Sequence, residues 1–140
     1  MEALYTAVAT SVGGRNGNVK SSDGVLNLEV KPPKEMGGPG GAFTNPEQLF
    51  AAGYSACFGS ALNHVALLKK RKVVPTITAK VSIGKKDDGG FQLAVEMDVN
   101  IPGIDQKDAE ELVHEAHQVC PYSNATRNNI EVKLNVTTNS

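Results

Sequence analysis

The sequence contains no tryptophan, and aromatic residues make up only 5% of its 140 positions. Few aromatic side chains leave little surface on which the bases of single-stranded nucleic acid could stack. A charge excess of one sign is also absent, because 14 basic and 15 acidic residues give a formal net charge of −1. We therefore expect no nucleic-acid partner, since such binding draws on a strong positive field.

Cysteine is scarce, with only Cys57 and Cys120 in the chain. An N-terminal secretion signal is not visible, because residues 1–10 include an acidic residue and alternate rather than form an apolar block. We expect a cytoplasmic protein. In that compartment two cysteines are either inert thiols or a working redox pair, rather than a permanent disulfide.

Charged residues are missing between Glu47 and Lys69. Asn45 can cap a helix that begins at Pro46. Proline suits the first turn of a helix because its nitrogen has no helical partner to lose. A helix without a charged face is expected to be buried on all sides. Polar residues and glycines interrupt the run, which favours a helix enclosed by the fold and disfavours a membrane span.

Alternating apolar and polar residues predict strands on both sides of this helix, and Gly-rich turns separate them. Apolar residues at spacings of three and four predict a second helix that begins after Asp105 and ends at Pro121. In chain order we expect strands at 4–12, 19–22 and 25–30, the long helix, strands at 76–86 and 91–101, the second helix, a short turn within 122–129 and a strand at 130–136.

This order of elements predicts an α+β fold in a single domain over residues 1–140. Consecutive hairpins indicate a mainly antiparallel six-stranded β structure around the long buried helix. The Pro/Gly-rich loop at 31–46 is long for a compact domain, and such loops are often functional. We expect residues 36–43 of this loop to be mobile enough to admit a substrate.

The two cysteines are the first candidates for chemistry. Cys57 lies midway along the first helix, and Cys120 lies on the apolar stripe of the second, so the sulfurs could approach if these faces pack together. A small buried hydrophobe is the plainer interpretation of each. His64 shares the face of Cys57 but is about 10 Å further along the axis, which is too far for a direct hydrogen bond.

Arg15 and Glu47 are the second pair of candidates. Arg15 lies in the turn GGRNG at 13–17, where an isolated arginine is usually a surface residue. Glu47 is either a first-turn carboxylate facing the helix dipole or a partner that fixes Arg15 by a two-pronged hydrogen bond. Because Glu47 precedes Cys57 by about 15 Å of helix, a second copy of the chain would unite them most easily, and we therefore expect a homodimer.

The histidines do not indicate a metal site. His114 and His117 are expected to be solvated residues on the second helix, and no residues have the spacing of zinc ligands. His64 is expected to be a core or interface histidine. We therefore expect no bound metal at these histidines.

Three segments together resemble a known family. They are NPEQLFAAGYSACF at 45–58, VCPYSNATR at 119–127 and GGRNG at 13–17. These segments are similar to signatures of the organic hydroperoxide resistance proteins of the OsmC-like superfamily. The resemblance covers nearly the whole chain, and the two cysteine-containing motifs are long and specific.

The resemblance implies a cysteine-based peroxidase that reduces organic, particularly fatty-acid-type, hydroperoxides and protects against oxidative stress. Cys57 would become a sulfenic acid, and Cys120 would resolve it to an intramolecular disulfide. Arg15 would hold the thiolate and polarise the peroxide, with Glu47 orienting it. The family also implies an intertwined homodimer with sites at its interface, no metal or haem, and a dihydrolipoyl group on a lipoylated protein as reductant.

Two alternatives remain open. One is a peroxidase of the OsmC branch, with similar chemistry and a different peroxide preference. The other is a non-enzymatic thiol switch that uses the same disulfide. An enzyme consumes peroxide far beyond its own thiol count, whereas a switch stops at one equivalent.

Overall fold

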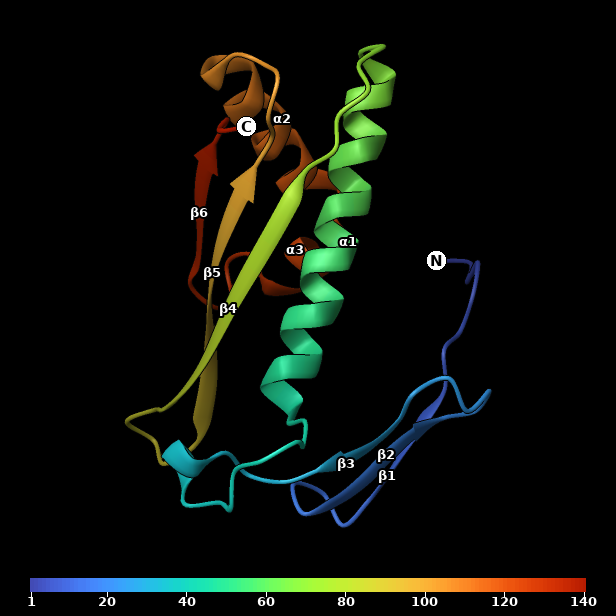
Figure 1. The fold of residues 1–140 in the computed structure, drawn as a ribbon, viewed down its shortest axis with the longest axis vertical. Coiled ribbons are helices and arrows are strands. Elements are labelled where there is room, and N and C mark those ends of the chain that lie inside the picture. The colour runs from blue at the N-terminus through green and yellow to red at the C-terminus, as the bar shows by residue number, and fades with distance from the viewer. The chain divides into compact units, whose positions relative to one another are not determined.

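The computed structural model describes residues 1–140, and the chain forms two compact units, residues 1–49 and residues 50–140. In the first unit, three strands form an antiparallel sheet in the order β1-β2-β3 (Figure 1). Their bounds are Ala9–Val12 for β1, Gly17–Ser21 for β2 and Asn27–Val30 for β3. A short 3₁₀ helix, η1 (Lys34–Met36), lies in the Pro/Gly-rich loop that follows.

Strand β1 is shorter than the alternation of its sequence predicts. Ala9 pairs with Ser21, the last residue of β2, and the chain then turns so that the Gly24 N–H donates to the Ser21 carbonyl. After one further hydrogen bond, from the Ser22 N–H to the Val8 carbonyl at 2.8 Å, the residues before β1 have no partner strand. Backbone pairing, rather than alternation, decides where a strand begins, so the predicted strand at 4–12 is wrong in its first five residues.

Helix α1 (Pro46–Leu68) begins at the end of the first unit and continues through the second. The second unit also contains a sheet in the order β4-β5-β6, with bounds Thr76–Lys85, Phe91–Asn100 and Val132–Thr137. Strands β4 and β5 form the predicted antiparallel hairpin, whereas β6 runs parallel to β5. Helices α2 (Gln106–Val119) and α3 (Pro121–Thr126) form the long connection that a parallel neighbour needs. Two sheets and three α-helices make this an α+β protein, as predicted.

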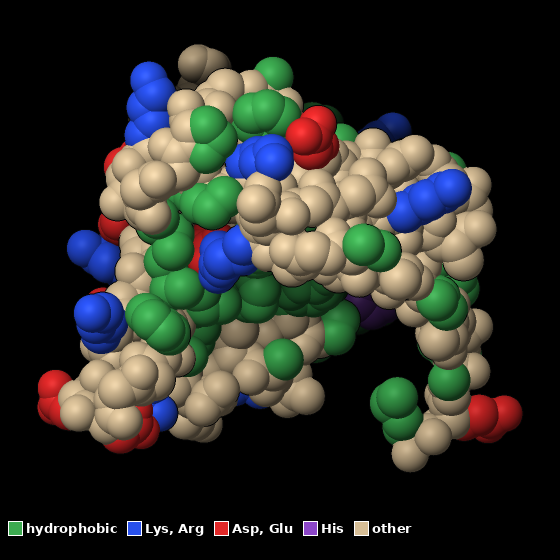
Figure 2. Space-filling model, turned by 90° about the horizontal axis from the view of Figure 1, so that it is seen from below, with side chains coloured by type: hydrophobic (Ala, Val, Ile, Leu, Met, Phe, Trp, Pro, Cys, Tyr) green, Lys and Arg blue, Asp and Glu red, His purple; other side chains and the backbone are tan.

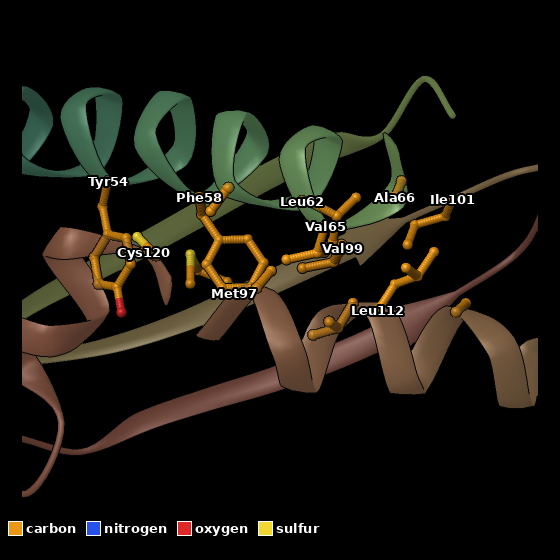
Figure 3. Packing of buried hydrophobic residues seen from close by; sticks show 14 of the residues in the cluster. Tyr54, Phe58, Leu62, Val65, Ala66, Met97, Val99, Ile101, Leu112 and Cys120 are labelled. Carbon is orange, nitrogen blue, oxygen red and sulfur yellow. The ribbon is translucent and has the colours of Figure 1, made fainter. Parts of the chain in front are cut away.

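The core of residues 50–140 lies between one face of this sheet and the helices α1 and α2 (Figure 3). Alternate residues of β5, namely Val95, Met97 and Val99, are buried because side chains of a strand alternate between its faces. They belong to one cluster with Phe58 of α1 and Leu112 of α2. Each such side chain stabilises the fold by roughly 1.5–3 kcal/mol, so packing fixes the helices that carry the cysteines.

Helix α1 is buried on one side only within this chain. Its buried residues are Tyr54, Phe58, Ala61, Leu62, Val65 and Ala66. Small or polar residues line the exposed side, among them Ala52, Ala56, Ser60 and Asn63. The expectation of burial on all sides is therefore not met within one chain, because the β4-β5-β6 sheet and α2 pack on the same side of the helix.

The two predicted caps differ in how they act. Asn45 caps α1 as predicted, because its side-chain oxygen accepts a hydrogen bond from the Gln48 N–H at 2.8 Å. Asp105 occupies the N-cap position of α2, but its side chain makes no capping hydrogen bond. Its contribution to α2 is therefore the interaction of a carboxylate with the helix dipole.

The basic segment 69–72 binds carboxylates of α2. Lys69 lies 2.6 Å from Glu115, and Arg71 lies 2.8 Å from Asp108. Such exposed ion pairs add little stability, but they neutralise part of the segment. Figure 2 shows basic and acidic side chains scattered over the face it presents, not gathered into one basic patch. No helix of the chain combines the length and the apolar character needed to cross a bilayer.

Candidate active site

The turn between β1 and β2 presents Arg15. The Asn16 N–H donates to the Gly13 carbonyl at 3.0 Å, and Gly13 and Gly14 have positive φ angles of 83° and 59°. A Cβ added at Gly13 would lie 2.6 Å from the Asn16 carbonyl oxygen. Glycine is therefore required at this position, and the tight turn that it permits directs one long basic side chain outward.

Arg15 forms a two-pronged ion pair with Glu47 in the first turn of α1. The Arg15 Nη1 and Nη2 atoms donate to the two Glu47 carboxylate oxygens at 2.9 and 2.6 Å. This hydrogen bonding is the main cause that lowers the pKa of Glu47, against an opposing effect of burial, and it raises the pKa of Arg15. The predicted pairing is confirmed, and both groups stay charged at neutral pH.

The two cysteines lie together in the second unit. Cys57 on α1 is half-buried, Cys120 between α2 and α3 is fully buried (Figure 3), and their sulfurs are 3.8 Å apart. Both are free thiols. The approach of the sulfurs that the helix faces suggested is confirmed, and it results from the packing of α1 against α2.

The surroundings of Cys57 within residues 50–140 favour the neutral thiol. Burial is the main cause that raises its pKa above the ordinary value of 9.0, and the nearby Cys120 thiol adds to the rise. The backbone of Tyr122 opposes this effect and lowers the pKa. A thiolate is the reactive form, so this sulfur needs a cation to react at neutral pH.

An apolar groove of about 530 Å³ lies in the second unit next to the cysteine segments. Its walls include Phe50, Phe91, Leu93, Pro121, Tyr122 and Ile130. Pro121 and Tyr122 directly follow Cys120, and Phe50 is two helical turns before Cys57. The groove therefore offers a surface for an alkyl chain beside the residues that follow Cys120.

Gly53 makes room for one wall of this groove. A Cβ added at Gly53 would lie 2.8 Å from the hydroxyl oxygen of Tyr122 and 3.2 Å from its Cζ atom. The Tyr122 ring also packs edge-on against Phe50 at 6.2 Å and lies 5.7 Å from the Tyr54 ring. Gly53, four residues before Cys57 in the sequence, thus lets the Tyr122 ring of α3 lie against α1.

The histidines are placed differently from expectation. His114 is exposed, as predicted, but His117 is half-buried, and its Nδ1 atom lies 2.9 Å from the Ser123 hydroxyl. Burial, with smaller effects from Arg127 and His114, lowers the pKa of His117. His64 is exposed, so its interpretation as a core residue is wrong for the single chain. No group of three or more His, Cys, Asp or Glu residues is arranged to hold a metal ion.

A buried hydroxyl cluster beside Cys120 has no clear signal in the sequence. The Tyr54 hydroxyl lies 2.8 Å from the Ser123 hydroxyl and 3.1 Å from that of Thr126. Ser123 and Thr126 belong to a six-residue helix, which is too short for periodicity to reveal its buried face. Only the position of Tyr54 on the face of Cys57, three residues earlier, could have indicated that its hydroxyl needs a buried partner.

The two-sheet α+β fold and the paired thiols define a protein of the OsmC-like class. The family described as OsmC-like protein matches residues 38–135. At 50% identity over 134 residues, the chain is similar to the organic hydroperoxide resistance protein of Xanthomonas axonopodis pv. citri (strain 306), covering 95% of this chain and 94% of that one. The OhrB organic hydroperoxide resistance protein of Bacillus subtilis (strain 168) is 50% identical over 135 residues, covering 94% of this chain and 97% of that one.

Solved structures agree with these relatives. The crystal structure of an organic hydroperoxide resistance protein from Elizabethkingia anophelis, with thiocyanate bound, has a TM-score of 0.95 at 58% identity, covering 99% of this chain and 100% of that one. The structure of Bacillus subtilis OhrB has a TM-score of 0.89 at 47% identity, covering 96% of this chain and 99% of that one. The chain therefore belongs to the organic hydroperoxide resistance branch of the OsmC-like family, as its motifs predicted.

Proposed function

We propose that the chain is a thiol-dependent peroxidase that reduces organic hydroperoxides to alcohols and so protects against oxidative stress. The observation that carries this proposal is the 3.8 Å separation of two free sulfurs. The names of its relatives support the same function, because those proteins are called organic hydroperoxide resistance proteins.

In the first step the Cys57 thiolate attacks the hydroxyl oxygen of the hydroperoxide. A sulfur–oxygen bond forms, the oxygen–oxygen bond breaks, and the alkoxide leaves and takes up a proton to become the alcohol. Cys57 is then a sulfenic acid, oxidised by two electrons. In this proposal Arg15 supplies the cation that holds the thiolate and polarises the peroxide, and Glu47 orients Arg15 through their two hydrogen bonds.

In the second step Cys120 resolves the sulfenic acid. Its sulfur bonds to that of Cys57, the sulfur–oxygen bond breaks, and the hydroxide leaves as water with the Cys120 proton. An external dithiol then reduces the disulfide by thiol–disulfide exchange, because a second thiol on the same molecule releases the mixed disulfide. We assign this role to a dihydrolipoyl group on a lipoylated protein, and the cycle needs no metal or resident cofactor.

The groove supports a preference for alkyl and fatty-acid-type hydroperoxides. Most of its lining residues are apolar, its polar groups come from Gln92, Thr126, Asn129 and the Tyr122 hydroxyl, and its volume of about 530 Å³ is within the range of small-molecule sites. Burying an alkyl chain there gains roughly 25 cal/mol per Å² of apolar surface. Hydrogen peroxide has no chain to bury and gains nothing from this surface.

An intertwined homodimer completes the proposal. The first unit has only one buried apolar residue, Val30, while Leu4, Tyr5 and Val25 are more than 80% exposed. A unit of this size is rarely stable with so small a core, and monomeric proteins rarely expose large apolar patches. A second copy would cover these side chains together with the small residues on the open side of α1. If the protein sediments as a monomer and is fully active in that state, this assembly is contradicted.

The test is multiple-turnover reduction of tert-butyl and linoleic acid hydroperoxides with dihydrolipoamide as reductant. The wild-type protein should consume many equivalents of peroxide, and Cys57→Ser should consume none. Cys120→Ser should stop after one equivalent unless an added monothiol reduces its sulfenic acid. A preference for hydrogen peroxide would favour the OsmC branch, and a wild-type protein that stops at one equivalent with every reductant would favour the switch.

A cytoplasmic location suits this chemistry, because a reducing compartment keeps a working thiol pair out of a permanent disulfide. Membrane and nucleic-acid partners have no part in the proposed cycle.

A further inference from the structure

Ser123 stands at the centre of a hydrogen-bonded cluster that the proposed cycle leaves unused. Its hydroxyl lies 2.8 Å from the Tyr54 hydroxyl of α1 and 2.9 Å from His117 Nδ1 of α2. Ser123 and Tyr54 are fully buried. A side chain held from two different helices has little freedom, so the first turn of α3 is tied to both helices that flank the cysteines.

The backbone of this turn faces both sulfurs. The Ser123 N–H donates to the Cys120 sulfur at 3.5 Å, and the backbone of the neighbouring Tyr122 lowers the pKa of Cys57. Two consecutive residues of the turn therefore act on the two reacting sulfurs. Any rotation of the turn would change the surroundings of both sulfurs together, and the Ser123 hydroxyl is the group that opposes such a rotation.

The connection to α1 has a direct geometric consequence. Tyr54 lies three residues before Cys57 and on the same face of α1. Its hydrogen bond to Ser123 therefore spans the same gap as the two sulfurs, which are 3.8 Å apart. A disulfide requires about 2.05 Å between sulfurs. Helix α1 and the first turn of α3 must therefore approach each other without sliding along each other.

We propose that Ser123, held by Tyr54 and His117, is the positioning residue for the step in which Cys120 attacks the Cys57 sulfenic acid. This inference rests on the proposed peroxidase function and concerns its second step. In that step the sulfur–sulfur bond forms, the sulfur–oxygen bond of Cys57 breaks, and water leaves with the Cys120 proton. Ser123 touches neither the peroxide nor the leaving oxygen in this step, and it acts by keeping Cys120 at high effective concentration.

The test separates the two steps in single-turnover reactions. Reduced protein is mixed with one equivalent of tert-butyl hydroperoxide in the presence of dimedone, which traps sulfenic acid, and the products at Cys57 are counted by mass spectrometry. Only folded, reactive molecules enter this count. The ratio of disulfide to dimedone adduct therefore reports the resolving step even where a variant is less stable.

Tyr54→Phe and Ser123→Ala should leave the rate of peroxide consumption within about twofold of wild type. Both should slow disulfide formation by at least about tenfold, the factor for one lost hydrogen bond, because each hydroxyl has two partners in the cluster. The dimedone adduct should rise accordingly. His117→Ala should behave in the same way. His117→Asn should restore the wild-type ratio, because its amide can bond the Ser123 hydroxyl from nearly the position of Nδ1.

Ser55→Ala is the matched control. It removes a hydroxyl from the same helix, but the Ser55 hydroxyl donates only to the Ala52 carbonyl of that helix, at 3.1 Å. Its ratio should equal that of wild type. Disulfide formation at the wild-type rate in both Tyr54→Phe and Ser123→Ala would overturn the proposal, and so would an equal loss of both steps.

A second arm keeps this result separate from the proposed function. Diamide closes a dithiol without peroxide, because one thiol adds to its nitrogen–nitrogen double bond and the second thiol displaces the adduct to give the disulfide. The same variants should slow this closure relative to wild type and Ser55→Ala. If wild type consumes no peroxide, the peroxidase proposal fails, while the diamide rates still test whether Ser123 positions Cys120.

Discussion

Replacing Arg15 with methionine should slow the peroxide step by a factor that depends steeply on pH. Within residues 50–140 the pKa of the Cys57 thiol lies above 9.0, chiefly because of burial. Without a cation, at most about 1 in 100 molecules would then carry the thiolate at pH 7. If Arg15 makes the thiolate dominant, its removal should lower kcat/KM for tert-butyl hydroperoxide by about 100-fold at that pH.

The pH profile distinguishes this cause from a general loss of structure. Stopped-flow rates of reduced protein with tert-butyl hydroperoxide should rise about tenfold per pH unit in Arg15→Met until the thiol ionises. The difference from wild type should shrink by about tenfold with each pH unit above 7 until the thiol of the variant ionises. Arg15→Lys is the control, because it keeps the charge but loses the two-pronged geometry, and it should recover part of the rate at pH 7. A loss that is equal at every pH would refute the assignment of Arg15 as the group that stabilises the thiolate.

Three further predictions follow from contacts in the structure. Glu47→Gln should lower the rate about tenfold in wild type but have little further effect in Arg15→Met, because Glu47 acts through Arg15, and additive losses in the double mutant would contradict this role. Gly53→Ala should leave the melting temperature equal or higher, since alanine favours a helix by about 1 kcal/mol, while the displaced Tyr122 ring lowers kcat/KM for linoleic acid hydroperoxide but not for the tert-butyl compound. Equal effects on the two substrates would count against Tyr122 as a wall of the groove. Because the pKa of His117 is lowered in the fold, its contribution to stability should be complete above its unfolded pKa of about 6.5 and be lost as pH falls toward the lower folded pKa. Urea unfolding at pH 5, 6 and 7.5 should therefore show that the free energy of unfolding changes less with pH in His117→Gln than in wild type.

The elements of the fold were predictable where local signals are strong. Alternation around Val95, Met97 and Val99 predicts β5 and its buried face, and the DDGG turn predicts the hairpin with β4. The start of β1 was not predictable from alternation, because it depends on where the partner strand ends. The prediction of a single domain over residues 1–140 stays a prediction, since the chain divides into two compact units.

Some contacts of the site could likewise be predicted from the sequence, and others could not. The pairing of Arg15 with Glu47 could be predicted because few cations and acids in the chain occur in such constrained settings, a glycine turn and a helix start. The approach of the cysteine sulfurs could be predicted because both lie on apolar helix faces. The hydroxyl cluster around Ser123 could not, because serine and histidine in a helix are usually surface residues, and burial of their polar atoms is decided by tertiary packing.

Burial at Cys57 has two opposing consequences for a peroxidase. In the proposed cycle the apolar surroundings favour an alkyl hydroperoxide over a small polar one, but the same surroundings raise the pKa of the thiol and so lower its reactivity. Tyr122 contributes to both sides of this balance, since its ring lines the groove while its backbone N–H stabilises charge on the sulfur. One amide does not offset the burial, so the proposed peroxidase assigns the stabilisation of the thiolate to a cation, Arg15. The two-pronged bond to Glu47 keeps Arg15 charged and limits its rotamers, which suits that proposed role.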